Sequence, residues 1–112
     1  MAESTIKRLM LQSYLFSKDF DNDSTSFTLK FAFEFQKLLI SGSRFGNNLI
    51  LNFKKNGESK GTFIFNPPFD NAYYSKLCYI SEPVYGEYEV EVSWSTSWNQ
   101  NKGTLNFIGL NY

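Results

Sequence analysis

The chain contains no histidine and a single cysteine, Cys78. Without histidine, Ser-His-Asp and Cys-His nucleophile systems and most zinc sites are excluded. One cysteine cannot form a disulfide within the chain, and because Cys78 lies among apolar residues, a buried thiol is expected. The commonest hydrolytic and zinc chemistries are therefore absent, and no cofactor is predicted.

Neither sign of charge is in excess, because 11 basic residues balance 11 acidic ones in 112 residues. No basic patch that would bind phosphates is visible, so nucleic acid is not a predicted partner. No apolar run reaches the length of a membrane span, and the N-terminal MAESTIKR is not followed by the apolar segment of a secretory signal. The protein is therefore predicted to be cytoplasmic, with non-classical release as the alternative.

Aromatic residues are abundant, with 12 Phe and 7 Tyr, and many of them alternate with polar residues. A period of two, as in 27–36, is typical of a half-buried strand because successive side chains point to opposite faces. The segment 6–16 alternates less clearly, and its pattern fits either a strand or a short helix. A strand is favoured. The predicted strands are 6–16, 27–36, 37–40, 49–54, 61–65, 77–80, 88–98 and 104–110.

These strands, with turns rich in Gly and Asn and no confident helix, predict an all-β fold: one antiparallel β-sandwich domain, 1–112, of about seven or eight strands. Asn56-Gly57 is a strong hairpin signal, because both residues tolerate the positive φ of a type I′ turn. In the strand 88–98, Trp94 is predicted to lie in the core. Trp98 is open to two interpretations, a core position or a half-exposed ring that stacks on a ligand.

Acidic residues alternate in two places, Asp19, Asp21 and Asp23 in a polar turn and Glu87, Glu89 and Glu91 along a strand. The first set has the spacing that opens calcium loops, but the glycine and distal glutamate of an EF-hand are missing, so no metal site is predicted. Glycoside hydrolysis needs carboxylates that face each other across a cleft. Three on one strand face more often form a solvated edge, so an enzyme is not predicted.

The segment SGSRFGNN is interpreted as a Gly/Ser/Asn loop after the strand at 37–40. Ser41, Gly42 and Ser43 would offer hydroxyls and backbone groups in fixed directions, as sugar hydroxyls require. A plain turn explains the same composition and is favoured by composition alone.

FNPPFDNAYYSK is the most distinctive stretch. Its prolines fix φ and restrict the residues before them, so the segment leaves the sheet in a defined direction. Rings and polar atoms there suit a sugar face, or a choline headgroup through cation–π attraction. A Tyr-rich corner bonded back to the chain is the alternative. The residues of this stretch that would contact the ligand are Phe69, Asn71, Tyr73 and Tyr74.

FNPPFDNAYYS resembles the segment F-S-x-P-[YF]-D-x-N-x-Y-S of the sea-anemone pore-forming toxins, the actinoporins. The resemblance implies a β-sandwich in which Pro68 and Tyr74 help to form a phosphocholine pocket. The chain lacks the amphipathic N-terminal helix that actinoporins insert, so pore formation is not implied.

A second resemblance covers more of the chain. STIK, SGS, NGES and Cys78-Tyr79-Ile80 are similar to the order of elements in the fungal fruit-body lectins. This resemblance implies a galactose-type site that draws on Ser41, Gly42 and Asn71.

The predicted function is non-catalytic carbohydrate binding through the aromatic loop. The alternatives are binding of a phosphocholine headgroup and self-assembly as a structural protein, which near-zero net charge and abundant rings favour. A homo-oligomer is also compatible with carbohydrate binding, because several subunits gain avidity. The predicted ligand-binding residues are Ser41, Gly42, Ser43, Pro68, Phe69, Asn71, Tyr73, Tyr74 and Trp98.

Overall fold

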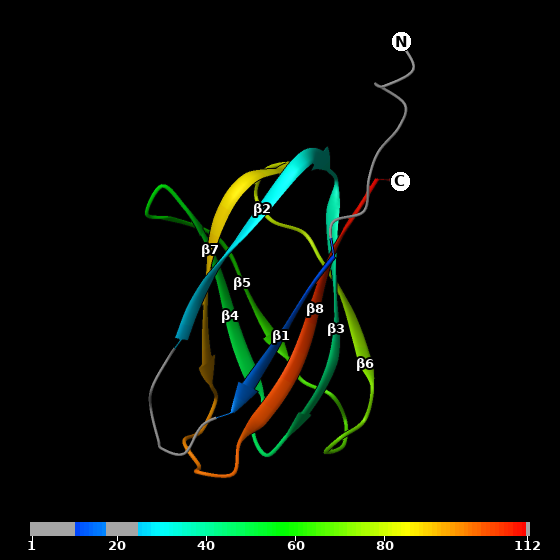
Figure 1. Cartoon of the computed structure of the whole chain (residues 1–112), viewed down its shortest axis with the longest axis vertical. Helices are drawn as coiled ribbons and strands as arrows, with labels where there is room; N and C mark the ends of the chain where they lie inside the picture. The colour runs from blue at the N-terminus through cyan, green and yellow to red at the C-terminus, as the bar shows by residue number, and fades with distance from the viewer. Residues whose placement is uncertain (1–10, 18–24, 112) are drawn as a thin grey trace.

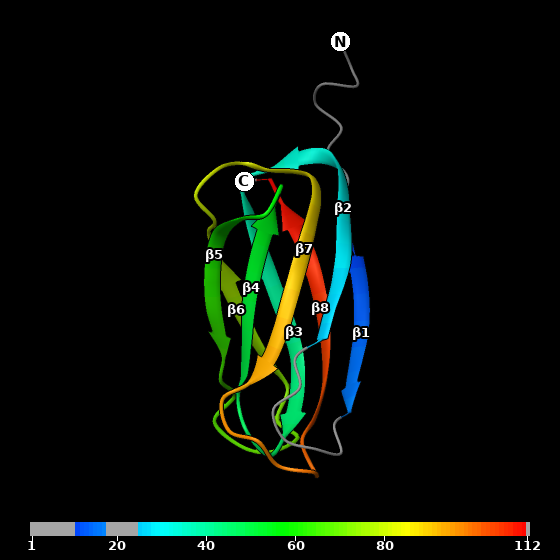
Figure 2. The same ribbon diagram turned by 90° about the vertical axis from the view of Figure 1, so that its left-hand side faces the viewer.

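The computed structural model describes residues 11–17 and 25–111, which form eight strands in two antiparallel sheets packed face to face (Figures 1 and 2). One sheet has the order β1-β8-β3-β6 and the other has the order β2-β7-β4-β5. The predicted all-β sandwich is confirmed. The strands are β1 (Leu11–Ser17), β2 (Thr25–Phe35), β3 (Lys37–Phe45), β4 (Leu49–Lys55), β5 (Glu58–Phe65), β6 (Tyr74–Cys78), β7 (Val84–Trp94) and β8 (Lys102–Leu110).

The core lies between the two sheets and is built from the inward half of each alternating strand. In β2 the burial alternates with a period of two from Ser26 to Phe31, as the sequence predicts. Phe107 of β8 joins the sheets, since its ring centroid lies 5.5 Å from that of Phe27 in β2 and 6.0 Å from that of Phe53 in β4. In Figure 2 the β2-β7-β4-β5 sheet faces the viewer and the other sheet lies behind it.

The turn between β4 and β5 confirms the predicted hairpin. Lys55 pairs with Glu58, so that only two residues form the loop. These are Asn56 with φ of 53° and Gly57 with φ of 80°. Both values lie in the left-handed region that a type I′ turn requires, and that Asn and Gly adopt most readily.

The loop predicted at SGSRFGNN is wrong for its first five residues, because Ser41 to Phe45 continue β3 and the turn occupies only 46–48. Gly42 explains the composition. A Cβ placed on Gly42 would lie 1.8 Å from the carbonyl oxygen of Thr104 in β8, and its φ is 155°. Two central strands thus approach so closely here that only glycine fits, and a sequence that resembles a loop forms the middle of a sheet.

Several other strand boundaries differ from the prediction, and two of the strands matter for the site. The strand predicted at 88–98 begins at Val84 and ends at Trp94, so Trp98 lies in the following loop. Trp94 is partly buried and packs against the core, as predicted. The strand predicted at 77–80 is β6, which begins three residues earlier, at Tyr74.

Several expectations concern single residues. Cys78 is 2% exposed, and burial raises the pKa of its thiol to about 11, so the predicted buried thiol is confirmed. Asp19, Asp21 and Asp23, and residues 6–10 of the first predicted strand, lie outside the described residues. Among the described residues no group of side chains could hold a metal ion, and no helix is long and apolar enough to cross a membrane.

Candidate ligand-binding site

Most of the predicted ligand-binding residues lie where three loops meet, at the end of the sandwich drawn at the bottom of Figure 1. Hydrogen bonds tie the loops together. The amide of Gly46 donates to Asp70 Oδ1 over 3.0 Å, and the amide of Asn47 donates to Asn101 Oδ1 over 2.9 Å. The loops are therefore braced against one another. They comprise residues 46–48, 66–73 and 95–101.

Arg44, near the end of β3, is the centre of this bracing. Its guanidinium donates to Asp70 Oδ1 over 2.5 Å, to the carbonyl oxygen of Pro67 over 2.7 Å and to Asn48 Oδ1 over 3.2 Å. The carbonyl oxygen of Arg44 also accepts the amide of Asn71 over 2.7 Å. A buried arginine that satisfies several acceptors fixes the FNPPFDNAYYSK loop without any ligand.

The aromatic residues of these loops divide into two groups. Phe69 is 71% exposed, Tyr73 is 74% exposed and Trp98 is 43% exposed. Trp98 stacks on Phe45 of β3, with ring centroids 5.7 Å apart. Tyr74 instead packs edge-on against Phe65 at 5.6 Å and belongs to the rim of the core. Three exposed rings on a braced loop end are thus free to contact a ligand, and Tyr74 is largely structural.

The polar residues predicted to bind the ligand differ in how accessible they are. Ser43 and Asn71 line one small hollow beside Phe45, with a volume of about 80 Å³. Ser41 is only 3% exposed, and Gly42 is buried where β3 and β8 approach each other. Pro68 is exposed. The hollow could take the edge of a sugar, and Ser41 and Gly42 offer almost no surface to it.

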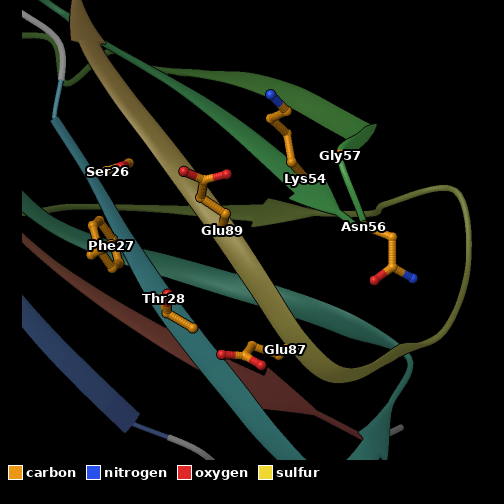
Figure 3. A pocket seen from close by; sticks show the side chains of 8 residues that line it. All are labelled: Ser26, Phe27, Thr28, Lys54, Asn56, Gly57, Glu87 and Glu89. Carbon is orange, nitrogen blue, oxygen red and sulfur yellow. The ribbon is translucent and has the colours of Figure 1, made fainter.

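A larger groove lies on the outer face of the other sheet, and sequence analysis did not find it (Figure 3). Its volume is about 380 Å³, which falls in the range of small-molecule sites. Glu87 and Glu89 project from β7 between β2 and the β4–β5 hairpin. The residues that line it are Ser26, Phe27, Thr28, Lys54, Asn56, Gly57, Glu87 and Glu89.

The carboxylates on the outer face of β7 differ in their partners. Glu91 accepts hydrogen bonds from Lys54 Nζ and Asn52 Nδ2, both over 3.2 Å. These bonds, Lys54 first, lower the pKa of Glu91. Within the part of the chain that the structure describes, Glu87 and Glu89 make no side-chain hydrogen bond or ion pair. Two acceptors in the groove are therefore unused by the protein.

Three further polar side chains of the groove also have no partner in the described part of the chain, although Lys54 is paired with Glu91. The hydroxyls of Ser26 and Thr28 and the amide of Asn56 have no side-chain partner among the described residues. Tyr85 lies two residues before Glu87 in β7, and its ring is 54% exposed. A polar groove with an exposed ring further along the same strand offers hydrogen bonding and stacking within one sheet.

A third hollow, of about 360 Å³, lies near the turn between β2 and β3. Its carboxylate Glu82 is already engaged, because it accepts hydrogen bonds from Lys60 Nζ and from the hydroxyl of Tyr88, both over 3.1 Å. Lys60 is the main cause of the lowered pKa of Glu82. Glu34 is a second carboxylate of this hollow and has no partner among the described residues, whereas the groove over β7 has two such carboxylates on one strand face.

Glu87, Glu89 and Glu91 share one face of a strand, as the sequence predicts, but the predicted solvated edge is wrong. β7 is in fact a central strand of its sheet, between β2 and β4. The positive-φ hairpin at Asn56 and the alternation of β2 were both visible in the sequence. The sequence does not show that β2 and β4 both pair with β7. This pairing brings the three segments together around one groove.

Comparison with known proteins gives a match to a solved structure. No family model matches the chain, and no curated protein matches it. Among solved structures, the chain is similar to the CBM36-1 domain of a multidomain xylanase from the hindgut metagenome of Trinervitermes trinervoides. The TM-score is 0.54 at 17% sequence identity, and the match covers 91% of this chain and 97% of that domain. The likeness shows that this chain has the β-sandwich fold of that domain.

The resemblance to actinoporins and fungal fruit-body lectins is wrong, since the structural match is to the xylanase module. The contacts of FNPPFDNAYYS explain how the sequence misleads. Pro67 accepts a hydrogen bond from Arg44, and Asp70 forms an ion pair with the same guanidinium. Tyr74 packs on Phe65. These residues thus brace a loop, and no pocket is needed to explain the motif.

Proposed function

We propose that the protein is a carbohydrate-binding module that holds a sugar chain in the groove over β7. The observation that carries the proposal is the groove of about 380 Å³, whose carboxylates Glu87 and Glu89 have no partner among the described residues. Sugar hydroxyls need donors and acceptors in fixed directions, and a sheet face supplies them on rigid strands. The similarity to a carbohydrate-binding module supports the same class of ligand.

Each side chain has a chemical role in this proposal. Ionised Glu87 and Glu89 accept hydrogen bonds from sugar hydroxyls, and such charge-assisted bonds are about twice as strong as neutral ones. The amide of Asn56 donates from the hairpin, and Thr28 can donate or accept from β2. The ring of Tyr85 gives an apolar surface against which one sugar face stacks.

The charge of the groove sets its selectivity. Glu87 and Glu89 contribute two negative charges, and Lys54 is neutralised by its ion pair with Glu91. Like charges repel, so the groove disfavours sugars that carry carboxylates or sulfates. Neutral or amino-bearing chains are the expected ligands.

Isothermal titration calorimetry with neutral hexasaccharides tests the proposal. The panel is xylohexaose, cellohexaose and chitohexaose, and at least one should bind. The double variant Glu87→Gln/Glu89→Gln should weaken its binding by about tenfold or more, because each lost charge-assisted bond is worth about 1.5–3 kcal/mol before water replaces it. Glu58→Gln is the matched control, because Glu58 lies in the β4–β5 hairpin beside the groove but does not line it. This variant should bind the sugar with wild-type affinity. No heat with any hexasaccharide would refute the proposal.

The loop end is the second candidate surface, because Phe69, Tyr73 and Trp98 are exposed there beside Asn71. If the sugar binds at the loop end, the proposed function is still carbohydrate binding and only the binding surface differs. The same titration separates the two surfaces. Binding that is lost in Tyr73→Ala and Phe69→Ala, and unchanged in the glutamate variants, would assign the sugar to the loop end.

A further inference from the structure

The outer face of the β1-β8-β3-β6 sheet exposes aliphatic side chains in register. Leu11 of β1 pairs with Ile108 of β8, Ile108 with Leu39 of β3, and Leu39 with Leu77 of β6. One apolar row therefore crosses all four strands. Leu11 is 69% exposed and Leu77 is 42% exposed, although a sheet face in contact with water normally carries polar residues.

Charge distinguishes this face from the outer face of the other sheet. The outward positions of β8, β3 and β6 alternate with the core residues of those strands, and none of them is Asp or Glu. Lys37 and Lys102 are its cations, at opposite ends of the face. On the opposite sheet, the single strand β7 already carries three acidic residues, Glu87, Glu89 and Glu91. One face of the sandwich is thus charged, and the other is nearly free of charge.

We propose that two copies of this chain pack face to face through the β1-β8-β3-β6 sheet. The two-fold axis runs parallel to the strands, midway between β8 and β3. This axis places each cross-strand row on the same row of the second copy. Leu11 then lies opposite Leu77 of the second copy, and Ile108 lies opposite Leu39 of the second copy. An isologous interface needs such a self-complementary pattern.

The polar rows match equally well. The next row along the strands contains Ser13, Asn106, Ser41 and Ser75. The axis puts Asn106 opposite Ser41 of the second copy and Ser13 opposite Ser75 of the second copy. Ser41 is only 3% exposed, so the polar contacts of this row come from Ser13, Ser75 and Asn106. Lys37 lies opposite Leu110 of the second copy, and Lys102 lies opposite Phe45 of the second copy, as the register of β3 and β8 requires. No two like charges face each other, and the chain as a whole carries no net charge that would oppose association.

The size of the face fits a weak, specific dimer. The four strands are about 4.8 Å apart, and β1, β8, β3 and β6 contain 7, 9, 9 and 5 residues. The face therefore covers roughly 19 by 25 Å, or about 480 Å² per copy. The total of about 950 Å² is that of a weak, transient interface. Dissociation in the micromolar range is expected.

The arrangement does not depend on the proposed sugar site. Both grooves over β7 lie on the outer surfaces of the dimer, because they belong to the opposite sheet. The small hollow that contains Ser43 lies at the rim of the interface, since Ser43 pairs with Thr104 on the packed face.

Sedimentation equilibrium between about 5 μM and 1 mM measures the dissociation constant of the dimer. The variants are placed at Leu11 and Leu77, because Leu11 faces Leu77 of the second copy. Leu11→Lys alone and Leu77→Glu alone should each shift the protein to the monomer, with at least a tenfold rise in the dissociation constant. The double variant Leu11→Lys/Leu77→Glu should recover most of the dimer, since lysine then faces glutamate at both ends of the row. Only the proposed two-fold axis predicts this rescue.

Ile64→Lys is the matched control, because Ile64 is 48% exposed on the other sheet. It should leave the dimer unchanged. A wild-type protein that is monomeric at 1 mM would overturn the proposal, as would an open-ended larger assembly. Single variants that dimerise like the wild type would overturn it too, and failure of the double variant to recover would overturn the placement of the axis.

Discussion

Replacing Arg44 by alanine should destabilise the fold and loosen the loop end together. The side chain is 10% exposed and bonds to Asp70, the Pro67 carbonyl and Asn48. Alanine removes all three bonds and leaves the buried carbonyl of Pro67 without a donor. The loss of a buried hub, rather than of a surface ion pair, is the reason to expect a large effect.

The magnitude follows from the separate contacts. An unpaired buried carbonyl costs about 1–3 kcal/mol, and a charge-assisted bond contributes about 1.5–3 kcal/mol. The carboxylate of Asp70 is 48% exposed, so its share is reduced by solvent screening. A total loss of about 3 kcal/mol is expected. For a domain of this size the midpoint of thermal unfolding should fall by about 12–20 °C.

Two readouts test this expectation. Calorimetry gives the unfolding midpoint of Arg44→Ala, and hydrogen exchange reports the amides of Gly46 and Asn71, which are bonded to Asp70 and to the Arg44 carbonyl. Both amides should exchange faster in the variant. Asp70→Asn keeps one oxygen acceptor and should cost only about 1 kcal/mol. A fall in the midpoint of less than about 5 °C in Arg44→Ala would refute the assignment of Arg44 as the hub.

Three further outcomes are expected. Gly42→Ala should prevent folding or cost more than about 4 kcal/mol, since its Cβ would overlap the Thr104 carbonyl oxygen; a folded variant with native circular dichroism and an unchanged midpoint would contradict this. Hydrogen bonds from Lys54 and Asn52 lower the pKa of Glu91, so its contribution to stability is present above about pH 4.5 and is lost as the pH falls further. Glu91→Gln should therefore flatten the fall in unfolding midpoint measured between about pH 5 and pH 3. Burial raises the pKa of Cys78 to about 11, so an aromatic disulfide reagent at neutral pH should react at least about 100-fold more slowly in native protein than in urea.

The sequence was sufficient where local physics decides the structure. The alternation of β2 follows from half-burial of a strand, and the hairpin at Asn56-Gly57 follows from the positive φ that both residues tolerate. Both were predicted from a few consecutive residues. The same local reasoning also identified Cys78 as buried, since its neighbours are apolar.

Local reasoning failed where partners distant in sequence decide. Ser41 and Gly42 resemble a loop in composition, yet they are small because β8 passes very close to β3 at Thr104. The groove could not be predicted for the same reason, because Thr28 and Glu89 meet only when β2 and β7 pair in one particular register. Cross-strand pairing between segments about 60 residues apart has no signature in a single sequence.

If both proposals hold, the dimer should bind polymers more tightly than short sugars. Each copy then carries one groove, and the two grooves face in opposite directions, so the dimer can bridge two neighbouring chains within an insoluble polysaccharide with a gain in avidity of about 10²–10⁴ where both contacts form. The monomeric variant Leu77→Glu keeps its groove intact, because Leu77 lies on the other sheet. It should bind a soluble hexasaccharide with wild-type affinity and an insoluble polysaccharide at least about tenfold more weakly. Pull-down on the insoluble polymer beside calorimetry on the hexasaccharide measures the two affinities. An equal loss on both ligands would show that Leu77 acts on the sugar site itself, and no loss on either would show that the two grooves do not act together.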